Sequence, residues 1–147
     1  MAAGDHPPAW SRLARRLWRP FLTPEEKQLI ASTIAEVERQ TTSSIRVRVI
    51  GRMGRREPLE LARRTFRSLS LHKTEARHGV LILISHLDHR FAIWGDEGID
   101  SQAGQRVWDR AAQTLRAHLS ERRYAEGIQA CVREVGRELA RHFPASR

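Results

Sequence analysis

Residues 79–84 read Gly-Val-Leu-Ile-Leu-Ile, a continuous apolar run of strand length. Such a run predicts a strand that is buried on both faces at the centre of a sheet. Residues 45–50 (IRVRVI) alternate instead, which predicts a half-buried strand toward a sheet edge, with Arg46 and Arg48 on its wetter face. Residues 91–94 follow the central run after a short polar connection, close enough to form a hairpin with it.

Helical patterns surround these strands. Thr23, Pro24 and Glu26 form a capping-box sequence that opens a helix over residues 24–39. Glu57 and Pro58 open a second helix, and apolar residues at helical spacing predict two more over residues 102–119 and 124–142. The order α-β-α-β-β-α-α predicts an α/β fold, a three-layer α/β/α sandwich around a small mixed sheet, with residues 23–147 as one domain.

Residues 1–22 form a basic amphipathic lead to this domain. Apolar side chains recur at helical spacing on one face of residues 10–21, and arginines occupy the other face. The lead could fold back onto the domain, lie on an anionic membrane surface, or dock into a groove of a protein partner. The residues expected to make a membrane or partner contact are Trp10, Arg12, Arg15, Arg16, Trp18 and Arg19.

Composition excludes several classes of protein. The chain has 147 residues, of which 40% are hydrophobic, and no apolar run approaches the ~18 residues that cross a bilayer. The N-terminus lacks the pattern of a secretory signal, so we expect a cytoplasmic protein, peripheral at the membrane if the lead binds lipid. A single cysteine, Cys131, excludes an internal disulfide framework and a thiolate-rich metal site.

Several motifs occur in an order that resembles the TPM domain family. They are TPEEKQLIASTIAEVERQTTSSIRVRVI, EPLELARRTFRSLSLHKTEARHGVLILIS, DHRFAIWGDEGI and RRYAEGIQACVREVGRELARHFP, and the likeness spans residues 22–144. The family includes bacterial members, both soluble and membrane-tethered, and plant thylakoid-lumen proteins. The resemblance implies an α/β/α sandwich. It also implies calcium binding, described for some members, or acid phosphatase activity, described for plant members.

The sequence departs from the family at one position. Related chains commonly read Thr-Ser-Gly-Glu before the first strand, whereas this chain reads Thr42, Ser43, Ser44. The acidic side chain that the resemblance would place at Ser44 is therefore missing, which weakens any cation site that depends on it.

Carboxylates gather after the last predicted strand, where Asp96, Glu97 and Asp100 lie within five residues. Hard cations such as calcium prefer carboxylate oxygens, and ligands of α/β folds often sit outside strand ends. Glu57 would supply a fourth carboxylate if its loop lay at the same sheet edge. The alternative is a polar turn in which Gly98 takes a positive φ and Asp100 or Ser101 caps a helix.

Basic charge is concentrated in residues 46–67, which carry eight arginines and a net charge of +6 within a chain of +9. The residues expected to face an anionic partner are Arg46, Arg48, Arg52, Arg55 and Arg56. Two alternatives stay open, a solvated basic edge and a nucleic-acid-binding domain that uses the basic Gly51–Gly54 loop.

Two other patterns could carry chemistry. His86, Asp88 and His89 crowd one turn and are metal-ligand types, although a solvated turn explains them too. Cys131 and Arg137 have the C-x5-R spacing of cysteine phosphatases, but Cys131 keeps the register of a buried helix face. No nucleophile or general base emerges. We therefore expect a binding module that holds calcium, with a metal-dependent phosphatase as the enzymatic alternative.

Overall fold

The computed structural model describes residues 21–71, 78–99 and 105–145, with side chains in the last range from Trp108 onward. Its elements follow the predicted order α-β-α-β-β-α-α and confirm the α/β class. Within the described residues, no helix is long and apolar enough to cross a membrane. The element bounds are α2 Pro24–Glu38, β1 Ser44–Ile50, α3 Pro58–Ser68, β2 Gly79–Ser85, β3 Arg90–Gly95, α5 Gln105–Ser120 and α6 Tyr124–His142.

Residues 1–20 of the predicted lead lie outside the described residues, whereas its last two residues, Phe21 and Leu22, are described. The role of the lead in contacting a membrane or a partner therefore stays a prediction for all of its candidate residues, which are Trp10, Arg12, Arg15, Arg16, Trp18 and Arg19.

The sheet has the strand order β1-β2-β3, with β1 parallel and β3 antiparallel to β2. Ser44 pairs with Gly79 at one end of the β1–β2 ladder, and Ile50 pairs with Ser85 at the other. All seven residues of β2 are buried. This confirms the prediction of a central strand covered on both faces and of an edge strand at residues 45–50.

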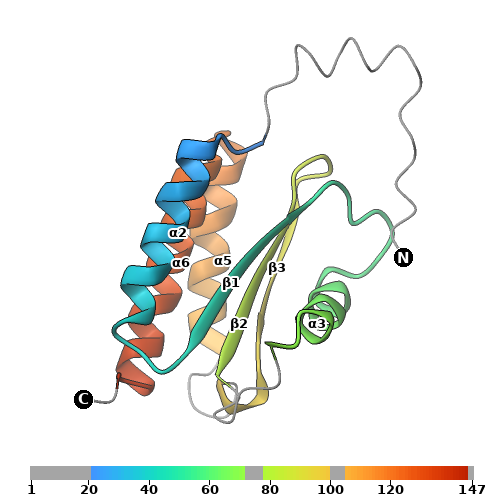
Figure 1. The fold of residues 1–147 in the computed structure, drawn as a ribbon. Helices are drawn as coiled ribbons and strands as arrows, with labels where there is room; N and C mark the ends of the chain where they lie inside the picture. Colours follow the sequence, from blue (N-terminus) through green and yellow to red (C-terminus); the bar gives the residue numbers. More distant parts are fainter. Residues whose placement is uncertain (1–20, 72–77, 100–104, 146–147) are drawn as a thin grey trace, which may run out of the picture.

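Two layers of helix cover the sheet, as Figure 1 shows. Val80, Ile82 and Ile84 belong to the larger core, which they share with α2, α5 and α6. The alternate residues Leu81 and Leu83 belong to a smaller core under α3. The period of two along a strand thus divides one apolar run between two cores.

Local signals define the two helices that flank β1. Thr23 Oγ1 accepts the amide of Glu26 at 3.1 Å, and the carboxylate of Glu26 accepts the amide of Thr23 at 3.0 Å, which completes the predicted capping box. Glu57 caps α3 directly before Pro58. Both predicted helix starts are confirmed.

Helix α6 lies between α2 and α5, and two of its glycines allow the close approach (Figure 1). A Cβ added at Gly127 would lie 2.5 Å from His118 Cβ of α5, and one added at Gly136 would lie 2.3 Å from Val37 Cγ1 of α2. Real Cβ atoms do not come so close to another carbon. The absence of a side chain at each glycine therefore lets the neighbouring helix, α5 or α2, pack this closely on α6.

We expect Gly136→Ala to lower the free energy of unfolding by about 1–3 kcal/mol, because α2 must move away to admit the methyl group. Urea denaturation measures the change. Replacing Val37 by Ala in the same chain removes the methyl groups that clash, so the double variant should recover part of the loss. Equal stability of the single variant and the parent chain would show that α2 and α6 pack less closely.

Candidate functional site

Asp96 is placed at the end of β3 by backbone and side-chain bonds. Its amide donates to Gly79 O at 2.9 Å, and its Oδ1 accepts the amide of Glu97 at 2.8 Å. Its carbonyl accepts the amide of Ile99 at 2.9 Å, so Asp96 begins the helical turn at residues 97–99. Asp96 is buried and Glu97 is exposed. Asp100 lies outside the described residues.

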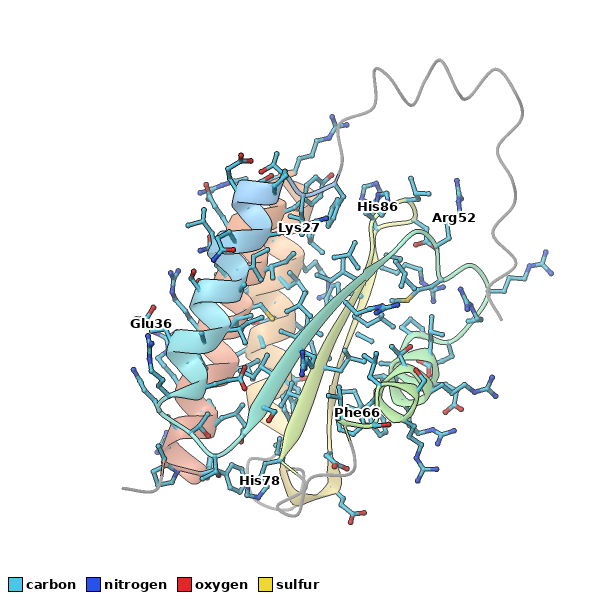
Figure 2. All side chains as sticks on the ribbon, in the orientation of Figure 1. Lys27, Glu36, Arg52, Phe66, His78 and His86 are labelled. Carbon is cyan, nitrogen blue, oxygen red and sulfur yellow. The ribbon has the colours of Figure 1, made fainter. Side chains whose placement is uncertain are left out.

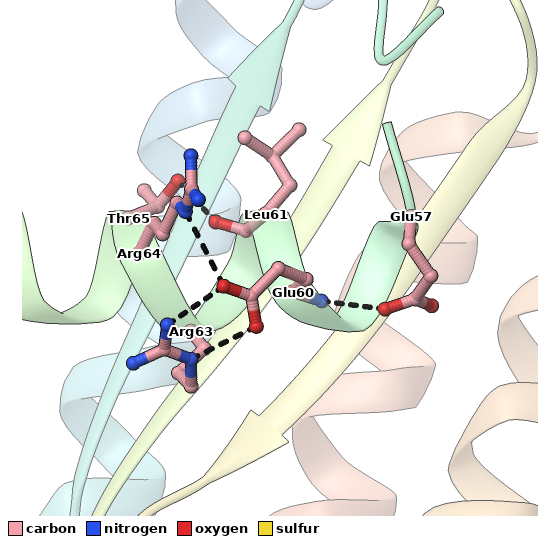
Figure 3. A network of polar contacts seen from close by, with 6 residues as sticks. All are labelled: Glu57, Glu60, Leu61, Arg63, Arg64 and Thr65. Carbon is pink, nitrogen blue, oxygen red and sulfur yellow. Dashed lines mark hydrogen bonds and ion pairs between the residues drawn. The ribbon is translucent and has the colours of Figure 1, made fainter. Parts of the chain in front are cut away.

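Glu57 belongs to a different part of the molecule. Its carboxylate accepts the amide of Leu59 at 3.0 Å and that of Glu60 at 2.7 Å, as the N-cap of α3 (Figure 3). It follows the sheet end where Ile50 pairs with Ser85, whereas Asp96 lies beside Gly79 at the opposite end. The structure therefore does not bring Glu57 to Asp96, contrary to the expectation that their loops share one sheet edge.

Among the described residues, few side chains at the Asp96 end of the sheet offer an oxygen ligand to a cation. Ser44 starts β1 at this end, two strands from Asp96, and it offers a hydroxyl where related chains carry a carboxylate. No group of three or more His, Cys, Asp or Glu side chains that could hold a metal occurs in the described part of the chain. Since calcium takes about 6–8 oxygens, these residues do not form a calcium site by themselves.

Two of the predicted basic residues, Arg46 and Arg48, lie on the α3 side of the sheet, and the other three follow in the loop after β1. Arg46 and Arg48 pair in register with Leu81 and Leu83, which face α3, and both arginines are exposed. Helix α3 packs mainly on β3 and less on β2, so the β1 half of this face is left to the two arginines. The basic patch consists of Arg46, Arg48, Arg52, Arg55 and Arg56, all exposed.

Acids near the basic patch are already engaged. Glu60 accepts two bonds from Arg63, at 3.0 and 2.7 Å, and one from Arg64 at 3.3 Å (Figure 3). The hydrogen bond from Arg63 is the main cause that lowers the pKa of Glu60 to about 2. Glu57 accepts the backbone bonds of its cap. Glu60 therefore pairs with two arginines of α3 that are not part of the basic patch.

Asp88 fixes the loop that carries three of the five arginines of the basic patch. Its Oδ2 accepts the amides of Met53 at 3.0 Å and Gly54 at 2.9 Å, and its Oδ1 accepts a short bond from Ser85 Oγ. Gly54 has a φ of 64°, which suits glycine at this turn. The carboxylate between β2 and β3 thus holds the loop that leaves β1.

Side-chain bonds brace the same loop from both sides. The guanidinium of Arg56 donates to Met53 O at 2.9 Å and to Arg52 O at 2.8 Å. Arg90, the first residue of β3, donates to the carbonyls of Gly54 and Arg56. Met53 itself is 1% exposed and belongs to the core under α3. The loop is therefore anchored, and Arg52 extends outward at this end of the sheet (Figure 2).

The structure also places the two remaining sequence patterns. In the turn of residues 86–89, Oδ2 of Asp88 accepts the loop amides and its Oδ1 accepts from Ser85 Oγ of β2. The His86 ring stacks on Phe21 with centroids 5.1 Å apart. Cys131 lies fully buried within α6, and burial is the main cause that raises the pKa of its thiol to about 12. The exposed Arg137 is on the same helix, so the two residues form no phosphate-binding loop.

A cavity of about 540 Å³ lies near the start of α6 and was not signalled by any sequence pattern. Its lining includes the rings of Phe21, His86 and Tyr124, and the Phe21 and Tyr124 centroids are 4.4 Å apart. The lining comes from three separate segments of the chain, residues 21–26, 86–87 and 122–126, which explains why local periodicity gave no sign of it.

We expect Asp88→Ala to lower the free energy of unfolding by about 1–3 kcal/mol at pH 7, because it leaves two loop amides without their acceptor. Denaturant titration measures the change, and Glu36→Ala, which removes an exposed carboxylate, serves as the control. Burial opposes ionisation of Asp88, but bonds from Ser85, Gly54 and Met53 outweigh it, so the pKa is lowered.

The same pKa shift gives this prediction a pH dependence. A carboxyl group whose pKa is lowered in the folded protein stabilises that protein at pH values above its pKa in the unfolded chain, near 3.8. That contribution is lost as the pH falls through the folded pKa. The stability gap between the parent chain and Asp88→Ala should therefore shrink below pH 3.8, and a gap of constant size down to the acid unfolding range would contradict the role given to the carboxylate.

Solved structures with a similar fold come from several bacteria. The NMR structure of the BA42 protein from Bizionia argentinensis has a TM-score of 0.81 and 27% identity, over 88% of each chain. The N-terminal domain of a protein from P. gingivalis has a TM-score of 0.70 and 16% identity, over 86% of this chain and 83% of that one. The N-terminal domain of cg2496 from Corynebacterium glutamicum has a TM-score of 0.66 and 14% identity, over 80% of this chain and 74% of that one. No curated protein matches the chain.

The match to a family model settles the classification that the resemblance implied. The model of the TPM domain matches residues 19–138, which include every strand of the sheet and most of α6. The chain therefore belongs to the TPM domain family.

Proposed function

We propose that this TPM domain is a non-enzymatic binding module whose basic patch contacts an anionic surface of a protein partner. The observation that carries the proposal is the set of exposed guanidinium groups on an edge strand and an anchored loop. Arg48, Arg52 and Arg55 have no ion pair with any described residue. Arg46 has one acidic neighbour, Glu38, whose pKa is raised because the effect of burial exceeds the lowering effect of the Arg46 charge.

Anchoring supports this proposal as much as charge does. A partner that binds a flexible loop must order it, which costs free energy, whereas a preorganised surface avoids most of that cost. Met53 is buried in the core under α3, and Asp88 and Arg90 hold the loop backbone on either side of Gly54. Arg52 and Arg55 are thereby presented from a fixed backbone.

We expect the parent chain to bind polyglutamate with an affinity that falls as salt increases, because exposed charge pairs are screened. Arg48→Glu with Arg52→Glu should weaken this binding by about tenfold or more, since repulsion replaces attraction at two positions. Isothermal titration calorimetry at two salt concentrations measures the effect. The matched control is Arg133→Glu, which reverses an exposed charge on α6.

Two outcomes would contradict the proposal. An equal effect of Arg133→Glu would show that net charge alone controls binding. Tighter binding to duplex DNA than to polyglutamate, with a steep salt dependence that Arg52→Glu reduces, would favour the nucleic-acid-binding alternative.

We also propose that residues 96–100 take part in calcium binding, as a second role of the module. Asp96 and Glu97 are consecutive carboxylates at one end of the sheet, and Asp96 is only 5% exposed. Glu57 has no part in this proposal, because it caps α3 at the other end of the sheet. Other oxygens must complete the coordination, and Asp100 is the candidate that the sequence offers.

Calcium at millimolar concentration should shift the amide resonances of residues 95–99 and raise the melting temperature, because a ligand held only by the folded state stabilises it. Asp96→Asn keeps a side chain that can cap a helix but removes its charge, so it should abolish the response. Glu57→Gln should leave the response unchanged. Absence of shifts at residues 95–99 in the parent chain would exclude the calcium role.

The phosphatase alternative gains no support from the described residues. Cys131 is buried with a raised thiol pKa, and in the described part of the chain no metal-ligating group of three side chains occurs. Metal-assisted phosphoryl transfer needs a cation beside the transferred group, together with a positioned nucleophile.

A further inference from the structure

The outer edge of β1 carries backbone groups that the sheet does not use. Ser44 N donates to His78 O at one end of the β1–β2 ladder, and His86 N donates to Ile50 O at the other. Alternate residues of a strand direct their backbone groups to the same neighbour. The backbone groups of the even-numbered residues from 44 to 50 therefore bond to β2. The backbone groups of Ile45, Val47 and Val49 face away from β2.

No further strand pairs with β1 among the described residues, where the sheet order ends at this strand. Figure 1 views the molecule from this side, with β1 in front of β2 and β3 and the helix layers to either side. Val47 and Val49 are partly exposed, as expected for an uncovered edge, whereas every residue of β2 is buried. An uncovered edge strand of this length is a template for pairing with another segment.

The side chains along this edge define what could pair with it. Arg46 and Arg48 project on the α3 side, while Ile45, Val47 and Val49 project toward the larger core. Successive side chains of an added strand alternate in the same way, and facing pairs lie about 4.5–5.5 Å apart. One face of the added strand would therefore meet arginine, and the other would meet aliphatic side chains.

We infer that β1 binds its partner by strand addition, and that the partner is an extended protein segment in which acidic residues alternate with aliphatic ones. The acidic residues pair with Arg46 and Arg48, and the aliphatic ones extend the larger core at Val47 and Val49. A second copy of this chain fits the edge poorly, because β1 against β1 sets arginine beside arginine. The inference rests on the proposed function and adds the geometry of binding to it.

A blocked peptide of alternating Glu and Val, as long as β1, tests the inference on the full chain. On titration, the amides of Ile45, Val47 and Val49 should become protected from hydrogen exchange, because strand addition gives them new acceptors. The amides of Arg46 and Arg48 already bond to β2, so their protection should change little. Protection that is uniform along β1, or absent, would overturn the inference.

N-methylation of the peptide separates strand addition from simple charge attraction. Two versions carry methyl groups on alternate residues, one set on the Glu amides and the other on the Val amides. Only one set faces β1, so one version should bind about tenfold more weakly or worse, and the other should bind like the parent peptide. Equal binding of all three would overturn strand addition and leave the basic patch as an anion-binding surface.

Variants of the chain complete the design. Val47→Pro removes an outward amide, which an edge strand tolerates, so it should weaken the unmethylated peptide without unfolding the sheet. The melting curve of Val47→Pro shows whether this variant is folded. If the variant is unstable, the methylated peptides still test strand addition on the parent chain.

If Arg48→Glu leaves both peptide and polyglutamate binding unchanged, the proposed function fails together with the inference. Peptide-independent dimers in solution would point to pairing between two copies.

Discussion

The complete burial of β2 is the constraint on which the rest of the fold depends. None of its seven residues reaches solvent, and its aliphatic side chains project alternately to two faces. Burying each such side chain contributes about 1.5–3 kcal/mol, whereas a whole domain is stable by about 5–15 kcal/mol. Exposing two of these side chains to solvent would therefore remove a large share of the domain's stability. Both faces of β2 thus need a layer of helices.

The two layers are unequal, and the inequality creates the candidate site. Three helices cover one face, and α6 with its close contacts to α2 and α5 makes that layer continuous. Among the described helices, only α3 covers the other face, over β3 and part of β2. Met53 extends this cover from the loop after β1, which explains why Asp88 and Arg90 hold the loop backbone. The half of the face beside β1 carries Arg46 and Arg48, and no described helix covers it.

Local patterns predicted the elements well because each depends on nearby residues. The caps at Thr23 and Glu57 and the run of residues 79–84 have short-range causes, and the structure confirms all three. The meeting of Glu57 and Asp96 failed for a topological reason. A hairpin reverses the chain, so the residue after β3 returns to the end of the sheet where β1 and β2 begin. That consequence was contained in the predicted hairpin itself.

The role of Asp88 could not be predicted in the same way. Its partners Met53 and Gly54 lie more than thirty residues earlier in the sequence, and only the fold brings the two loops together. A glycine in a basic loop and an aspartate in a tight turn are each ordinary signals. Their pairing depends on β1 and β2 being parallel neighbours, because this arrangement sets the exit of β1 beside the exit of β2.

Arginine on an edge strand has two physical consequences that act together. Like charges oppose pairing between two identical edges, which protects an uncovered strand against aggregation. The same charges favour a strand that carries acidic residues, since facing opposite charges stabilise a cross-strand pair. Lysine or arginine would serve the first purpose equally. The planar guanidinium also forms paired bonds with a carboxylate, so arginine at residues 46 and 48 adds geometric selection to repulsion.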